Sequence, residues 1–220
     1  MEKDLEKPTK KAYVSIALFP ENGIVKGFQS GLVAITNKIY GMQNGVIVGA
    51  ENVYGMENGV IVGAENVYGM QTGFYVVVEC DLKGMQNSLI FAGAKDVYGI
   101  QNSLFAGADN VYGIQNSFYG VVRGNLKGMQ NSLFAFTEGD LKGMQNSFYG
   151  VVRGDLKGIQ IGLHVFAKGR NSTGKQFGFL LWGPGNEWWN PSVFYQKLEP
   201  GKKVKPFGTL ETIMKKVWSG

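Results

Sequence analysis

The chain has 220 residues, of which 44% are hydrophobic and 33 are glycine, and its formal net charge is +5. This apolar content excludes a disordered chain, and the single cysteine, Cys80, excludes an intrachain disulfide and a cysteine-based metal cluster. No apolar run of about 18 residues occurs, so we expect no transmembrane helix. No aromatic and basic recognition motif accompanies the lysines, so we expect no nucleic-acid partner.

Residues 1–26 precede the repeats and contain one strand-like stretch, residues 13–19. Its branched and aromatic residues favour a strand, so we expect residues 1–26 to supply an N-terminal strand or cap. Residues 1–11 are highly charged and lack the apolar segment that a signal peptide needs. Two locations stay open: the bacterial cell surface or export if a signal was removed, and the cytoplasm otherwise.

Residues 27–182 form an array of repeats that each begin with glycine. Successive first glycines are 14 to 16 residues apart, and the third residue of every repeat is glutamine except at Glu57. The first glycines are Gly27, Gly41, Gly55, Gly69, Gly84, Gly99, Gly113, Gly128, Gly143, Gly158 and Gly174. A regular period of this kind is typical of one supersecondary unit stacked on copies of itself.

Each repeat favours strands and tight turns over helices. Glycine recurs in every repeat, often four or five residues apart, and costs about 1 kcal/mol at each position of a helix interior. The apolar positions hold branched and aromatic residues, which suit strands. The second position is Met or Ile in most repeats, as at Met42 and Ile100, and we expect it to contact the core. Polar pairs such as Asp109-Asn110 are typical of turns and close the repeats.

Two all-β architectures can be built from this repeat. In a parallel β-solenoid of about eleven coils, equivalent residues stack about 4.8 Å apart, whereas in an antiparallel meander β-barrel each repeat is one strand. The glutamine column favours the solenoid, because stacked amides hydrogen-bond from coil to coil. A charged column also favours it, because Arg123, Glu138 and Arg153 would alternate in sign when stacked. We therefore predict the solenoid, with the meander barrel as the alternative.

Residues 183–220 form an aromatic segment followed by a predicted capping helix. Leu210, Ile213, Met214, Val217 and Trp218 have the spacing of an amphipathic helix. A repeat array needs such a terminal element because its last coil leaves an open sheet edge. A helix that docks on a partner or on a membrane surface is the other interpretation.

Six aromatic residues are candidates for partner binding. Four belong to one repeat column and two to the C-terminal segment: Tyr54, Tyr68, Tyr98, Tyr112, Trp188 and Trp189. An exposed tyrosine column would form a flat aromatic strip, and exposed tryptophans could stack on sugars. Two other interpretations remain open: tyrosines that face the core, and tryptophans that plug the end of the array.

The sequence predicts no catalytic centre, metal site or cofactor. His164 is the single histidine and stands in a column of aromatic residues, and Glu57 occupies a column that otherwise holds glutamine. Residues 169–175 read GRNSTGK, but the next residue is not the Ser or Thr of a phosphate-binding loop. Residues 153–155 read RGD, which follows from repeat variation at a corner. We therefore expect no enzyme.

The repeats resemble those of bacterial surface-repeat proteins found in spirochaetes and other groups, whose units look like Gly-Leu-Gln-x-Gly-Leu-x-Asn. GIQIGL at residues 158–163 matches that unit, and VSIALFPENGIVKGFQSGLV at residues 14–33 is similar to the segment that opens such arrays. The string VIVGAENVYGMENG at residues 46–59 is also similar to the 14-residue β-roll repeats of trimeric adhesin heads. The resemblance implies a surface location.

These features predict a non-enzymatic repeat protein that acts in surface binding, adhesion or structural assembly through a regular extended face. Its partners would be a protein or carbohydrate surface ligand, or further copies of the chain. Many weak contacts along one face would add up to a firm attachment. The alternative is a membrane-active β-barrel of the pore-forming or toxin-like kind, which requires hairpins with an outward apolar band.

Overall fold

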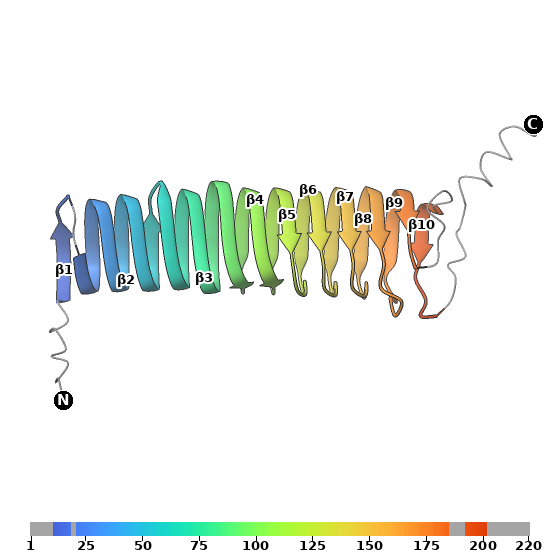
Figure 1. The fold of residues 1–220 in the computed structure, drawn as a ribbon, viewed down its shortest axis with the longest axis horizontal. Coiled ribbons are helices and arrows are strands. Elements are labelled where there is room, and N and C mark those ends of the chain that lie inside the picture. Colours follow the sequence, from blue (N-terminus) through green and yellow to red (C-terminus); the bar gives the residue numbers. More distant parts are fainter. Residues whose placement is uncertain (1–10, 19–20, 185–191, 202–220) are drawn as a thin grey trace, which may run out of the picture.

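The computed structural model describes residues 11–18, 21–184 and 192–201, which form one ten-stranded sheet and no helix. The strands follow each other in the sheet as in the sequence: β1 (Lys11–Ile16), β2 (Glu21–Asn58), β3 (Ile61–Val97), β4 (Ile100–Val111), β5 (Ile114–Val122), β6 (Met129–Thr137), β7 (Met144–Val152), β8 (Ile159–Ala167), β9 (Lys175–Trp182) and β10 (Ser192–Lys197). The sheet winds into an elongated rod of stacked coils (Figure 1).

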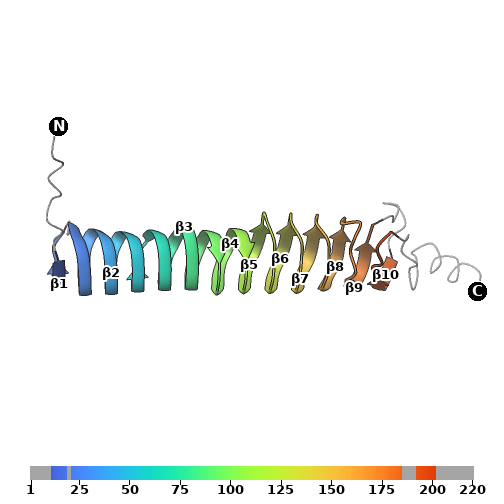
Figure 2. The same ribbon diagram turned by 90° about the horizontal axis from the view of Figure 1, so that it is seen from below.

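Strands β1 to β9 pair in parallel, so the predicted β-solenoid is confirmed and the antiparallel meander is not observed. Pairing joins equivalent residues of successive repeats, for example Gln115 with Gln130 and Asn116 with Asn131. Strands β2 and β3 are long because each continues around several coils (Figure 2). Each repeat is therefore one coil.

The first glycine of each repeat lets successive coils approach closely at one corner. A Cβ added to Gly113 would overlap the carbonyl oxygen of Gly99 in the preceding coil. At Gly41 the backbone also has a φ of 145°, a conformation that side-chain-bearing residues rarely adopt. The 14- to 16-residue glycine period is thus a steric requirement of the stacking.

The apolar core is a column of Val and Leu residues that lie one above another. Val97, Val111, Leu126, Leu141 and Leu156 are fully buried, and consecutive members from Val111 onwards pair in parallel bridges. Full burial of one such side chain contributes about 1.5–3 kcal/mol. This column supplies one inner side of every coil.

The second repeat position does not lie in the core, so that prediction was wrong. Met42 is 36% exposed, whereas Gln43 beside it is fully buried. Side chains alternate between the two faces of a strand, so burial of the glutamine places the preceding residue outside. The rod thus has a partly polar interior.

The two ends of the array differ. Strand β1 pairs in parallel with β2 and continues the stack at the N-terminal end. At the other end β10 pairs antiparallel with β9 and brings Gln196 and Leu198 into the interior, each 1% exposed. This returning strand was not predicted. The capping helix expected over residues 210–218 lies outside the described residues.

Candidate binding faces

Glutamine side chains form a hydrogen-bonded ladder inside the rod. From Gln101 onwards each amide nitrogen donates to the amide oxygen of the preceding coil at 2.7–2.9 Å, and the glutamines are fully buried. The ladder runs through Gln86, Gln101, Gln115, Gln130, Gln145, Gln160 and Gln176. Buried amides joined in this way stabilise the register, but they offer nothing to a partner.

Glu57 is the one acidic member of the glutamine column. Gln71 donates its Nε2 to Glu57 Oε2 at 2.7 Å, while Glu57 Oε1 and Gln43 Oε1 have no hydrogen-bond partner among the described residues. Burial raises the pKa of Glu57 from 4.5 to about 7, and the Gln71 hydrogen bond opposes the rise. A protonated Glu57 can donate to Gln43, which would restore the missing rung.

The outer surface carries two apolar rows that run along the rod, which we call the first and second outer rows. The first contains the sixth residue of each repeat, and every member is 37–57% exposed. Its members are Leu32, Val46, Val60, Phe74, Leu89, Leu104, Phe118, Leu133, Phe148, Leu163 and Phe179. The exposed members of the second row are Ile47, Ile61, Tyr75, Phe91, Phe105 and Tyr119. A continuous apolar surface of this kind is typical of an interaction site.

The predicted charged column exists, and it alternates in sign from Glu79 to Arg153. Arg153 lies 2.7 Å from Glu138, and Arg123 lies 3.7 Å from Asp109 in the coil before it. These side chains are largely exposed, so each pair contributes only about 0.2–1 kcal/mol. Lys95 continues the column, because it precedes Asp96, which pairs with Asn110.

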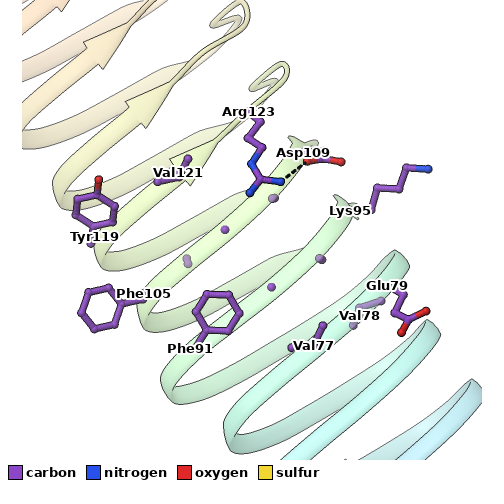
Figure 3. Close-up of a pocket in the computed structure, with 15 residues that line it drawn as sticks. Val77, Val78, Glu79, Phe91, Lys95, Phe105, Asp109, Tyr119, Val121 and Arg123 are labelled. Carbon is purple, nitrogen blue, oxygen red and sulfur yellow. Dashed lines mark ion pairs between the residues drawn. The ribbon is translucent and has the colours of Figure 1, made fainter.

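A trough with a glycine floor lies between the second outer row and the charged column, and we call it the glycine trough. Its floor is Gly93 and Gly107, Val77 and Val121 lie at its ends, and its volume is about 630 Å³. Figure 3 shows aromatic side chains along one wall and charged side chains along the other. The walls are Phe91, Phe105 and Tyr119 on one side and Glu79, Lys95, Asp109 and Arg123 on the other.

A second trough occupies the same face nearer the N-terminus, and we call it the acidic trough. Its floor is Gly49 and Gly63, and its volume is about 470 Å³. Its charged wall holds carboxylates alone, Glu51, Glu65 and Glu79, and its apolar wall is aliphatic, including Ile35 and Ile47. Both troughs have a glycine floor, but the side chains of their apolar walls and of their charged walls differ.

The candidate tyrosines lie on the surface in two stacked groups. Tyr54 and Tyr68 have ring centroids 5.0 Å apart, and Tyr98 and Tyr112 have centroids 4.8 Å apart, with nearly parallel planes in both pairs. Lys83 lies between the two groups, with its Nζ 5.1 Å from the centroid of the Tyr68 ring. The Coulombic interaction with Tyr68 is the main cause that raises the pKa of Lys83. Because the rings cover each other's faces, the row presents edges and hydroxyl groups.

The other residues and motifs singled out in the sequence either make contacts within the rod or lie outside the described residues. Trp188 and Trp189 lie outside the described residues. His164 stacks on Trp182 at 6.1 Å in the second outer row. In the loop that resembles a phosphate-binding loop, Ser172 is buried and its hydroxyl donates to the Gly169 carbonyl. In the RGD segment, the Asp155 carboxylate accepts a hydrogen bond from the backbone N–H of Asn171 in the next coil.

The described ranges contain no group of three or more His, Cys, Asp or Glu side chains that could hold a metal ion, and no helix there could span a membrane. Comparisons with protein-family models, curated proteins and solved structures gave no match. The class that the fold defines is therefore a parallel β-solenoid with two apolar outer rows.

Proposed function

We propose that this chain is a non-enzymatic repeat protein that acts in surface binding, adhesion or structural assembly through its two outer rows. The observation that supports this function is the exposure of every member of the first outer row, from Leu32 to Phe179. Soluble monomers rarely expose a continuous apolar surface of this length. The resemblance of the repeats to bacterial surface-repeat proteins supports a location at the bacterial surface.

The geometry suits many weak contacts in a line. A half-exposed Leu or Phe contributes on the order of 1 kcal/mol when a partner covers it. One such contact cannot offset the cost of association, but the first outer row repeats it in every coil. We favour this function over a pore-forming one because β1 to β9 pair in parallel, whereas a pore of that kind requires hairpins.

The test compares two triple variants of the full chain. The first changes Leu104, Phe118 and Phe148 to serine, and its control changes Lys127, Lys142 and Lys157 to glutamine on a different corner. Sedimentation velocity measures self-association, and pull-down measures retention on fixed bacterial cells and on insoluble cell-wall polysaccharide. Circular dichroism confirms that both variants keep the strand signal.

We expect the wild-type chain and the lysine control to self-associate or to be retained, and the outer-row variant to lose that behaviour. Physiological salt in all assays screens the charge difference between the variants. Equal behaviour of the outer-row variant and the wild type would show that the first outer row is not the contact face.

A further inference from the structure

No close contact requires a glycine at position 107, in the floor of the glycine trough. A Cβ added to Gly107 would meet no atom within 4 Å, unlike the Cβ at the first glycine of a repeat. The same column holds Val77 and Val121 at the two ends of the trough, so side chains fit there. The absence of a side chain at Gly107 keeps a volume of about 630 Å³ free, within the usual range of ligand pockets.

We propose that the glycine trough binds an uncharged oligosaccharide that lies along the rod axis. This inference deepens the proposed function, since it names a ligand class for one part of the extended face. The chemistry of the two walls carries it.

The aromatic wall offers ring faces to a ligand. Phe91, Phe105 and Tyr119 are 40%, 47% and 39% exposed, one from each of three successive coils. The rings of Phe105 and Tyr119 are tilted by 48° with centroids 6.4 Å apart, so they do not cover each other as the tyrosine row does. The apolar face of a sugar ring can pack on such a surface (Figure 3).

The charged wall suits a neutral ligand with many hydroxyl groups. Glu79, Lys95, Asp109 and Arg123 alternate in sign from coil to coil, so their charges cancel along the trough. Carboxylates accept hydrogen bonds, while the ammonium and guanidinium groups donate them. A hydroxyl group can do both, so each sugar unit finds a partner at either sign. A strongly charged ligand would meet repulsion at every second coil.

An extended peptide fits the trough less well. Peptides that bind to sheets pair their backbone with a free sheet edge. The floor of the trough is the middle of the sheet: Ala106 pairs with Gly120 and Gly107 with Val121. The N–H and C=O groups of a bound peptide would therefore find hydrogen-bond partners at the charged wall alone. An oligosaccharide has no such row of backbone amides.

Isothermal titration calorimetry of the full chain tests the proposal. The probes are uncharged hexasaccharides of glucose, mannose, galactose and N-acetylglucosamine, together with a random peptide library in a separate capture assay. Gly107→Val fills the floor, and Phe105→Ala removes a ring from the wall. Gly63→Val is the matched control, since a Cβ there also meets no atom within 4 Å but lies in the acidic trough.

We expect at least one hexasaccharide to bind the wild type and Gly63→Val equally, and both Gly107→Val and Phe105→Ala to weaken binding about tenfold or more. The proposal is overturned if no hexasaccharide binds the wild type, if Gly107→Val binds like the wild type, or if Gly63→Val weakens binding as much. Capture of peptides that Gly107→Val abolishes, without sugar binding, would also overturn it.

This titration separates the trough from the first outer row. The triple serine variant of the first outer row leaves all named walls of the trough unchanged, so it should bind the hexasaccharide like the wild type. The proposed function fails if that variant keeps wild-type adhesion and self-association. The proposal that the glycine trough binds an oligosaccharide is judged by the titration alone, independently of the adhesion assay.

Discussion

Replacing Glu57 by glutamine is expected to stabilise the rod above neutral pH and to remove a pH dependence. In the wild type, Glu57 Oε1 and Gln43 Oε1 lie without hydrogen-bond partners in the described part of the chain. A glutamine at position 57 would donate its Nε2 to Gln43 and still accept from Gln71. The repeats that begin at Gly41 and Gly55 would then be identical, because they differ at this one position.

The pKa of Glu57 gives the size and the direction of the effect. The folded-state pKa of about 7 lies above the ordinary value of 4.5, and at about 1.4 kcal/mol for each pKa unit the difference corresponds to about 3 kcal/mol. The folded state therefore holds the proton to a higher pH than the unfolded chain. This stabilisation is complete below about pH 4.5 and is lost as the pH rises through about 7.

The assay is urea unfolding of the wild type and of Glu57→Gln, followed by circular dichroism at pH values from about 4 to about 8. This range brackets the unfolded-state and folded-state pKa values of Glu57. We expect nearly equal stability at the acidic end and an advantage of about 3 kcal/mol for the variant at the basic end. Gln101→Glu is the converse control and should acquire a similar pH dependence. Stability curves of wild type and Glu57→Gln that stay parallel across this range would refute the reasoning.

Three further substitutions test the other elements of the stacking. Gly113→Ala should lower the free energy of unfolding by at least about 2 kcal/mol, measured by urea unfolding, because its Cβ overlaps a carbonyl of the preceding coil. Gln130→Leu should lower it by about 1–3 kcal/mol, since Gln115 Oε1 loses its buried donor, and hydrogen exchange should rise in the two neighbouring coils. Arg153→Ala breaks an exposed ion pair with Glu138, so the free energy of unfolding, measured by thermal unfolding, should change by less than about 1 kcal/mol.

The parallel fold could be predicted from the sequence because two kinds of column leave a signature there. Identical amides gain a hydrogen bond only when they stack in register, and opposite charges gain only when they alternate. The structure confirms both, with Gln130 bonded to Gln115 and Arg153 paired with Glu138. Period and column chemistry together were enough to choose between parallel and antiparallel pairing.

The direction in which each column faces could not be predicted from hydrophobicity. The usual rule places Met and Ile inside and glutamine outside, but this rod does the reverse at the second and third repeat positions. A buried glutamine is stable here because a copy above and a copy below satisfy its amide, and that satisfaction comes only with the assembled stack. Strand β10 was missed for a similar reason, since its pairing with β9 depends on a chain return that follows no repeat.

The glycine trough escaped sequence reasoning because two kinds of glycine look alike in a sequence. Gly113 is required by the close approach of two coils, whereas Gly107 has open space where a side chain would be. The column of Gly93 and Gly107 also holds Val77 and Val121, which indicates that side chains fit there. A mixed column alone does not separate the two kinds of glycine, because Gly150 pairs with Val165 although a Cβ added to Gly150 would overlap the Ser147 hydroxyl.

The glutamine ladder and the apolar outer rows have a common physical origin in this rod. The ladder holds successive coils at one spacing and in register, beside the buried column of Val and Leu. The same stacking repeats outward residues such as Phe118 and Phe148 at the strand spacing. Because the ladder fixes the spacing of the outer residues, a substitution at one outward position changes the surface of that coil without moving the outward side chains of its neighbours.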